Sequence, residues 1–126
     1  MTDYWRKAKT APQSAHSLLD LGDTEGAVNR AYYAMFNAAR TILEKLDPDL
    51  IAGKTHASVL RHFSNHVVKG GGLDPAHGRA LNRAFDARMT SDYEKAAIDK
   101  KEARDIVAAM DAFLAAIRPL VRKGRT

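Results

Sequence analysis

Arg88 is the residue whose type and position most directly suggest chemistry in this sequence of 126 residues. It follows Phe85 by three positions and Leu81 by seven, so it continues the apolar stripe of a predicted helix instead of its solvent face. A guanidinium is costly to bury without a partner, and Asp92, one helical turn later, can pair with it. The pattern leaves two interpretations: a salt bridge that ties a helix end to the core, or an anion-binding arginine with Tyr93 adjacent, which suits phosphate.

A second polar cluster, Lys54-Thr55-His56, stands where another helix is predicted to begin. Backbone N–H groups and the helix dipole favour anions at such a position. Lys54 and Thr55 also follow Gly53 like the end of a Walker A loop, but that motif requires a glycine where Pro48 stands. The cluster is therefore not interpreted as a nucleotide-binding loop.

Metal ligands are sparse in this sequence. His62 and His66 lie one helical turn apart, but a metal site would need a third ligand, and no Glu follows His62 as the HExxH motif requires. The chain has no Cys, which excludes a thiolate nucleophile, cysteine-ligated zinc and disulfides. We predict no metal site and no cofactor.

These polar residues need helices to position them, and the strongest pattern runs from about Thr24 to Leu46. Its core stripe is Val28, Ala31, Met35, Ala38, Ile42 and Leu46. A second stripe beside it contains Arg30, Tyr33, Asn37, Arg40 and Glu44. This polar-aromatic stripe is either a solvated rim or a wall of a cleft.

Four further segments show helical periodicity. One precedes Gly22 and contains Pro12, which either kinks the helix or marks its true first turn. Another begins near Thr55, the next begins at Asp74-Pro75, and the last spans about 99–122. Thr55, Asp74 and Asp99 are their predicted N-caps. Because no segment alternates as a strand and the connections are short, we predict an all-α fold, an antiparallel up-and-down bundle.

Composition favours a single globular domain over residues 1–126. The formal net charge is +5, but four basic residues lie in the last nine positions, in a basic tail at about 118–126. Without these four, 16 basic residues remain against 15 acidic ones, so charge alone does not establish a nucleic-acid partner. The start lacks the apolar stretch of a secretion signal, and no apolar run would span a membrane, so we expect a soluble cytoplasmic protein without membrane contact.

Four sequence blocks, taken together and in order, resemble the small prokaryotic HEPN domain proteins. They are GlyAsp at 22–23, AVNRAYYAMFNAARTIL at 27–43, KTHASVLRHF at 54–63 and LNRAFDARMTSDYEKA at 81–96. The resemblance implies a four-helix bundle with an additional short helix, often a homodimer. It also implies pairing with a small nucleotidyltransferase in a toxin–antitoxin module. Active members are metal-independent endoribonucleases with an R–x4–6–H motif, and the motifs of two subunits face one cleft.

The sequence departs from that motif. Arg88 matches the arginine, but Tyr93 stands five residues later, and Arg30 is followed seven residues on by Asn37. A literal match runs from Arg61 to His66 in a different predicted helix, and we interpret it as coincidence. Since the reference pKa of tyrosine is about 10, Tyr93 is a poor base at neutral pH, and His56 could substitute if the fold brings it beside Arg88.

Two functions remain open at this point. The first is an RNA-binding or metal-independent endoribonuclease subunit of a toxin–antitoxin-like module. The second is a non-catalytic HEPN module that binds a nucleotide or a partner protein. We expect Arg88, Asp92 and Tyr93 to approach His56, as catalytic residues. The same cleft should include the substrate-binding residues Lys54, Arg30 and Tyr33.

Overall fold

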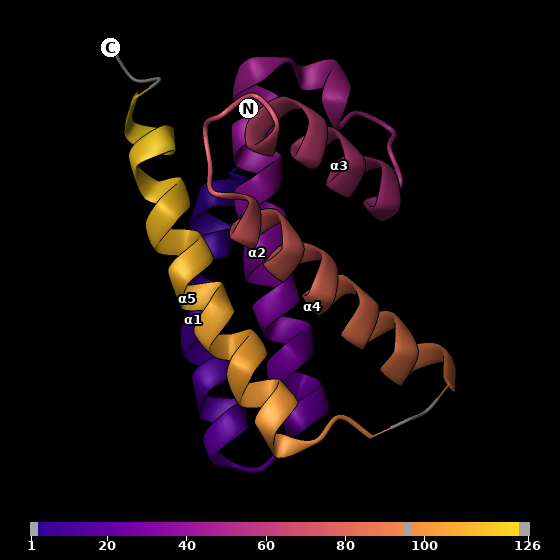
Figure 1. Ribbon diagram of the computed structural model, residues 1–126. Helices are drawn as coiled ribbons and strands as arrows, with labels where there is room; N and C mark the ends of the chain where they lie inside the picture. The colour runs from indigo at the N-terminus through magenta and orange to yellow at the C-terminus, as the bar shows by residue number, and fades with distance from the viewer. Residues whose placement is uncertain (1–2, 95–96, 124–126) are drawn as a thin grey trace.

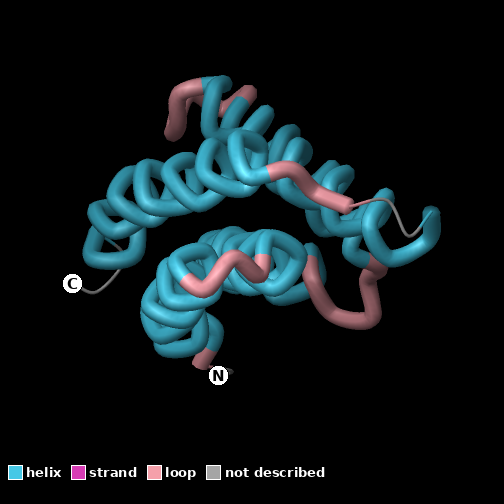
Figure 2. The backbone as a smooth tube through the Cα atoms, turned by 90° about the horizontal axis from the view of Figure 1, so that it is seen from below, coloured by secondary structure: helices cyan, strands magenta, loops and turns pink. Residues whose placement is uncertain are grey.

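The computed structural model describes residues 3–94 and 97–123, and these contain helices and loops but no strand (Figure 2). The α-helices are α1 (Tyr4–Asp20), α2 (Thr24–Leu46), α3 (His56–Phe63), α4 (Pro75–Glu94) and α5 (Lys100–Lys123). A 3-10 turn, η1 (Pro48–Leu50), follows α2, and a π-helical segment, η2 (Ser64–Val68), continues α3. The predicted all-α class is confirmed. The helix expected to run from Thr55 to the glycines divides into α3 and η2.

The four long helices alternate in direction, while the short α3 lies across one end of the molecule (Figure 1). Helices α1, α2 and α5 run side by side, and α4 inclines away from them (Figure 1). Helix α2 packs against α1, α3, α4 and α5, so it is the central element of the bundle. Its position explains why the side chains that support the candidate site come largely from α2.

The core follows the predicted stripes. On α1 the buried residues are Ala8, Ala11 and Ala15, and such small side chains allow a close approach to α2. The largest fully buried side chains come from α2 to α5: Tyr32, Phe63, Phe113, Met35, Leu43, Leu81, Ile106, Met110, Ile117, Val28, Val59 and Val107. The helices are therefore held together by one continuous apolar core.

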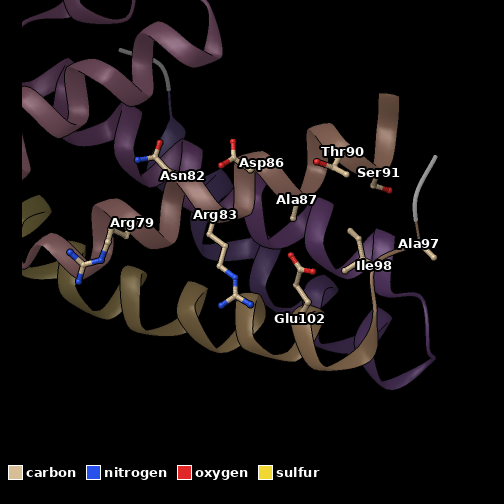
Figure 3. A pocket seen from close by; sticks show the side chains of 10 residues that line it. All are labelled: Arg79, Asn82, Arg83, Asp86, Ala87, Thr90, Ser91, Ala97, Ile98 and Glu102. Carbon is tan, nitrogen blue, oxygen red and sulfur yellow. The ribbon is translucent and has the colours of Figure 1, made fainter. Parts of the chain in front are cut away.

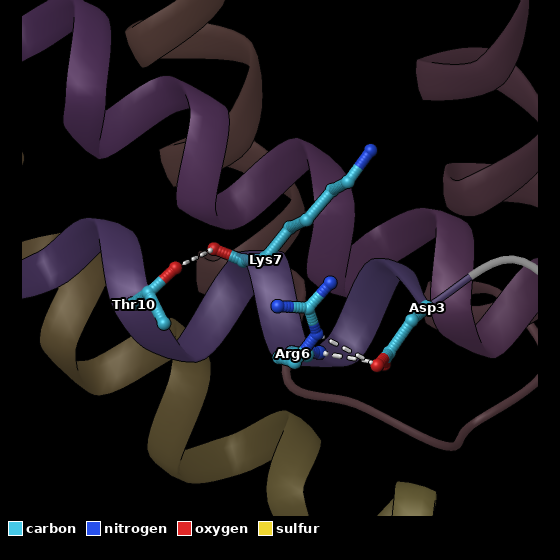
Figure 4. Close-up of polar contacts among 4 residues, drawn as sticks. All are labelled: Asp3, Arg6, Lys7 and Thr10. Carbon is cyan, nitrogen blue, oxygen red and sulfur yellow. Dashed lines mark hydrogen bonds and ion pairs between the residues drawn. The ribbon is translucent and has the colours of Figure 1, made fainter.

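Side-chain caps set the helix starts. The Asp3 carboxylate accepts from Arg6 N and Arg6 Nε at 3.1 and 2.9 Å, next to a local bond from Thr10 Oγ1 to the Lys7 carbonyl (Figure 4). The predicted caps at the other helices form as well. The backbone N–H groups of Ser58, Ala76 and Glu102 donate to Thr55, Asp74 and Asp99 respectively.

Prolines do not end either terminal helix. Pro12 lies inside α1, which begins eight residues earlier at Tyr4, so it does not mark the first turn. Pro119 lies inside α5, which continues to Lys123. The basic residues Arg118 and Arg122 are thus exposed on a helix, whereas residues 124–126 of the predicted tail lie outside the described residues. Within residues 3–94 and 97–123, no helix combines the length and the apolar character needed to cross a bilayer.

Candidate functional site

A pocket of about 410 Å³ lies between the start of α3 and the C-terminal half of α4. Its lining residues are Thr55, His56, Ala57, Phe85, Arg88, Met89 and Asp92. We call it the His56–Arg88 pocket. It brings together His56, Arg88 and Asp92, which the sequence analysis had placed in one cleft from two separate helices.

His56 is held from behind by two aromatic residues of α2. Its ring stacks on Phe36 with centroids 4.1 Å apart and an interplanar angle of 9°, and its Nδ1 lies 2.9 Å from the Tyr32 hydroxyl. Burial raises the pKa of Tyr32, so this hydroxyl keeps its proton and can donate it to Nδ1. In that arrangement the neutral imidazole carries its hydrogen on Nε2, where it is a hydrogen-bond donor.

The protonation of His56 is shifted by its surroundings. Partial burial lowers the pKa of His56, and the positive charges of Arg88 and Arg40 lower it further. The imidazole is therefore neutral at pH 7. It reaches the pocket as a polar group that adds no positive charge beside Arg88.

Arg88 has few partners inside the protein. Its side chain is 33% exposed, and its guanidinium carbon lies 5.4 Å from the centroid of the Tyr32 ring. Nε lies 3.7 Å from Asp92 Oδ2, too far for a hydrogen bond, and it is buried without a partner. The structure thus combines both interpretations of Arg88. A loose ion pair with Asp92 exists, and the guanidinium still lines a pocket.

Arg88 and Asp92 also separate two hollows. Both residues also line a second pocket, of about 300 Å³, which lies at the start of α2. Its remaining lining residues are Asp23, Glu25, Gly26, Asn29, Ser91 and Ile98. Because this hollow contains further carboxylates, an anion that binds Arg88 is better accommodated on the His56 side.

Other predicted site residues lie elsewhere. The guanidinium carbon of Arg30 lies 4.4 Å from the Tyr33 ring centroid, and Arg30 lines a hollow beside α1 with Gln13, Ser14, Ser17 and Leu18. The expectation that Arg30 and Tyr33 line the His56–Arg88 pocket is therefore wrong, because both project from a different side of α2 than Tyr32 does. Lys54 is exposed just before α3 and does not line the pocket. Tyr93 belongs to the last turn of α4, and its side chain lies outside the described residues.

Sequence reasoning missed three supporting residues: Tyr32, Phe36 and Arg40. The Arg40 guanidinium carbon lies 4.1 Å from the Tyr4 ring centroid and 4.5 Å from that of Phe36. One signal was available. Tyr32 and Phe36 follow Val28 at intervals of four, so they continue an inward stripe. The spacing from Arg30 instead favoured Tyr33 as the residue of the predicted cleft wall.

The polar-aromatic stripe of α2 is neither a solvated rim nor a cleft wall throughout. Asn37 is 0% exposed, its Nδ2 donates to the Tyr33 carbonyl at 2.9 Å, and its Oδ1 accepts from Arg40 Nη2 at 2.5 Å. This part of the stripe lies inside the fold and supports the stack beneath His56. It does not offer a continuous surface to a second copy of the chain.

A larger cleft, of about 440 Å³, lies between α4 and α5 but contains none of the predicted site residues (Figure 3). Its lining carries both signs of charge, because Arg79, Arg83 and Asp86 come from α4 and Glu102 comes from α5. Arg83 is partly neutralised, since its Nη2 lies 3.5 Å from Asp105 Oδ2. The cleft therefore offers a weaker anion site than Arg88 does.

His62 and His66 lie near each other, as their spacing predicts. The rings of His62 and His66 are 5.8 Å apart, and no group of three or more potential ligands occurs within residues 3–94 and 97–123. The Arg61-to-His66 match does not form a cleft either. Arg61 Nη2 donates to Ser58 Oγ at 3.2 Å, whereas His66 lines a groove beside α2.

Comparison with known proteins agrees with the motifs read from the sequence. The HEPN domain family matches residues 1–120. A UPF0332 protein of Thermotoga maritima is 34% identical over 121 residues, which cover 94% of this chain and 89% of that protein. A UPF0332 protein of Archaeoglobus fulgidus is 31% identical, covering 95% of this chain and 94% of its own. A Methanocaldococcus jannaschii protein named "Putative toxin MJ0605" is 29% identical, covering 77% and 70%. With nearly its whole length matched, the chain belongs to the HEPN domain family.

Proposed function

We propose that this HEPN protein is toxin-like and acts on RNA, and that the His56–Arg88 pocket binds a phosphate of the RNA backbone. Two Methanocaldococcus jannaschii relatives bear toxin names, which supports a toxin-like role. The four sequence blocks resemble the small prokaryotic HEPN proteins, whose active members are endoribonucleases, and this supports RNA as the target although Tyr93 stands where their motif has histidine.

One observation carries the proposal: donors from two separate helices line one pocket. Arg88 contributes a guanidinium with few internal partners, and neutral His56 contributes Nε2–H when Tyr32 donates to its Nδ1. A guanidinium and an imidazole N–H are suited to phosphate oxygens. Phe85 and Met89 line the same pocket and offer apolar contact area to a base or ribose.

Metal-independent cleavage is the activity that these residues would support. The 2′ oxygen of the RNA would bond to phosphorus while the P–O5′ bond breaks, which leaves a 2′,3′-cyclic phosphate and a 5′-hydroxyl. The proton from the 2′-OH would pass to the Asp92 carboxylate or to His56, and the leaving oxygen would take up one proton in turn. Arg88 would stabilise the charge that develops on the phosphoryl oxygens.

Binding without cleavage is the second candidate, and the Tyr32–His56 hydrogen bond favours it. With Tyr32 donating to Nδ1, the neutral ring presents Nε2–H and has no free lone pair facing the pocket. His56 in this form donates to a phosphate and accepts no proton. Cleavage would then depend on Asp92 or on a change of tautomer.

Incubation of the purified protein with total RNA in EDTA, followed by end-group analysis, tests the proposal. We expect binding or cleavage that is lost in Arg88→Ala and retained in Arg79→Ala, an equal charge change on the exposed face of the same helix. A 2′,3′-cyclic phosphate product would establish cleavage, whereas retained RNA without product would establish the binding module. Equal RNA retention by wild type and Arg88→Ala would refute the site.

A partner and a homodimer complete the proposed module. The resemblance implies a small nucleotidyltransferase antitoxin and a dimer in which two sites face one cleft. Light scattering at tens of micromolar, a usual range for weak dimers, should give twice the mass of 13.9 kDa. A monomeric mass at that concentration would reject the dimer and leave the RNA measurement unaffected.

A further inference from the structure

A second surface lies beside the C-terminal end of α2, away from the proposed RNA site. It is a groove of about 440 Å³ lined by Ile42, Lys45, Leu46, His66, Val67, Gly70, Gly72 and Leu120. We call it the Leu46 groove. The Leu46 groove shares no lining residue with the His56–Arg88 pocket. The two sites lie at opposite ends of the segment formed by α3 and η2: His56 begins α3, whereas η2 contributes to the groove.

The floor of the Leu46 groove is apolar and only partly covered. Ile42 and Leu46 lie one turn apart on α2, and Val67 and Leu120 come from η2 and α5. Leu46 is 58% exposed, although the other three side chains are buried or half-buried. A single exposed leucine is common on protein surfaces, whereas an exposed leucine that continues an apolar floor indicates a docking surface.

The shape of the groove depends on the glycine turn. Gly70 and Gly72 line it without side chains, so the backbone leaves room above Val67. A Cβ at Gly70 or Gly72 would lie 3.0 or 3.3 Å from the carbonyl oxygen of His66 or Val67 respectively. The backbone of the turn that follows η2 therefore favours glycine at both positions, and no side chain from them enters the groove.

Lys45 is the charged side chain in the lining of the groove. Lys45 and His66 line it, and no carboxylate does. Lys69 and Arg122 are exposed and adjoin Gly70 and Val121 in the chain, while Lys45 Nζ donates to the Val121 carbonyl. Glu44 and Asp47 adjoin the lining residues Lys45 and Leu46 in the chain, and none of these four flanking charged residues lines the groove itself.

We propose that the Leu46 groove docks an acidic amphipathic helix of a partner protein. Apolar residues of such a helix at i and i+4 match an apolar floor, and its carboxylates match Lys45 in a lining that contains no carboxylate. A second copy of this chain fits less well, because it carries a formal net charge of +5 itself. The occupant is therefore a different, acidic chain.

The test uses a fluorescent synthetic peptide of roughly four helical turns, with leucines on one face and glutamates on the other. Its anisotropy is followed with the full chain, with Leu46→Glu and with the matched control Leu21→Glu. Leu21 is the other exposed large apolar residue among those described, 81% exposed at the α1–α2 turn. A version with lysines in place of the glutamates tests the charge argument.

We expect the glutamate peptide to bind with a Kd below about 100 µM. Leu46→Glu should weaken binding at least about tenfold, since it removes the apolar contact and adds a like charge, whereas Leu21→Glu should change it less than about twofold. Far-UV circular dichroism should match in both variants because both leucines are exposed.

Three results would overturn the proposal. They are no binding of the glutamate peptide, equal binding by Leu46→Glu, and equal binding of the lysine peptide. A dimer in light scattering that Leu46→Glu dissociates would likewise reject it, because the groove would then hold a second copy. None of these results bears on RNA retention, so failure here is distinguishable from failure of the proposed function.

Discussion

Two arginines flank the aromatic cluster of Tyr32, Phe36 and His56, and they differ in how fully the protein satisfies them. On one side Arg40 lies between the rings of Tyr4 and Phe36, and its Nη2 donates to the fully buried Asn37. On the other side Arg88 has one ring at 5.4 Å and one carboxylate at 3.7 Å. The same residue type is enclosed in one place and available to a ligand in the other.

The difference shows that burial alone does not identify a functional arginine. Both side chains have a buried Nε without a hydrogen-bond partner. The two arginines differ in the contacts of the rest of the guanidinium. That of Arg40 contacts two aromatic rings and the Asn37 amide, whereas that of Arg88 lines a pocket. We infer that Arg40 stabilises the fold beneath His56 and that Arg88 serves the ligand.

Substitution Arg40→Ala should give the largest effect on stability. It removes two cation–π contacts and leaves the side-chain oxygen Oδ1 of the buried Asn37 without its donor, so we expect a loss of about 2 to 4 kcal/mol in the free energy of unfolding. Chemical denaturation measures it. Arg104→Ala, an exposed position on α5, is the control and should change stability by less than about 0.5 kcal/mol. Equal losses for Arg40→Ala and Arg104→Ala would remove the distinction between the two arginines.

Substitution Arg88→Ala should have the converse profile. We expect RNA affinity to fall by about tenfold or more, with a stability loss under about 1 kcal/mol, because only a loose ion pair and one distant ring are lost. Filter binding and thermal denaturation of the same preparation measure both quantities. Arg88→Lys should recover part of the affinity. A large drop in melting temperature with RNA affinity unchanged would make Arg88 the structural arginine.

The fold was largely predictable because it depends on local signals. Spacings of three and four identify the helical faces, and Thr55, Asp74 and Asp99 cap their helices as predicted. The division of the third helix into α3 and η2 was not predictable. A π-helical turn changes one hydrogen-bond register without a sequence marker as clear as Pro or Gly.

The site was predictable in its polar members and not in their support. Arg88 stands out because it interrupts an apolar stripe, and His56 stands out because it belongs to a polar cluster at a predicted helix start. Tyr32 and Arg40 gain their roles from contacts across helices, with His56 on α3 and Tyr4 on α1, and such contacts leave no periodic signal. Adjacent positions on a helix differ by about 100° in direction, so choosing Tyr33 instead of Tyr32 moved the expected cleft wall to another face.

The pKa of His56 offers a finer comparison of the two arginines. Both positive charges lower that pKa, and Arg88 contributes more than Arg40. In an NMR titration we therefore expect Arg88→Ala to raise the His56 pKa, and to raise it more than Arg40→Ala does. A larger rise of the His56 pKa in Arg40→Ala than in Arg88→Ala would instead show that Arg40 has the stronger electrostatic effect on the imidazole.

The same shift makes stability depend on pH. The pKa of His56 in the folded chain lies below the unfolded value of about 6.5, so the unfolded chain takes up the proton first as the pH falls. The melting temperature should therefore decrease on acidification from about pH 7 to pH 5, and the decrease should be smaller in His56→Gln. An identical pH dependence in that variant would show that His56 titrates alike in both states.

Chelation should have the smallest effect, on either side of the aromatic cluster. Guanidinium groups and hydrocarbon rings do not bind divalent cations, and the amide oxygen of the fully buried Asn37 already accepts from Arg40. In the lining of the pocket, His56 and Asp92 are the potential ligands. Two ligands are fewer than the three or four that catalytic and structural zinc sites use. We expect EDTA to leave the melting temperature and RNA binding unchanged, as measured by scanning fluorimetry and filter binding.

Added zinc serves as the control, because any weak binding at the His62–His66 pair should disappear in His62→Ala without altering RNA affinity. If EDTA instead lowered RNA binding and one divalent cation restored it in His62→Ala, a cation would share the phosphate with Arg88, and the enclosed-versus-available contrast would no longer account for the site.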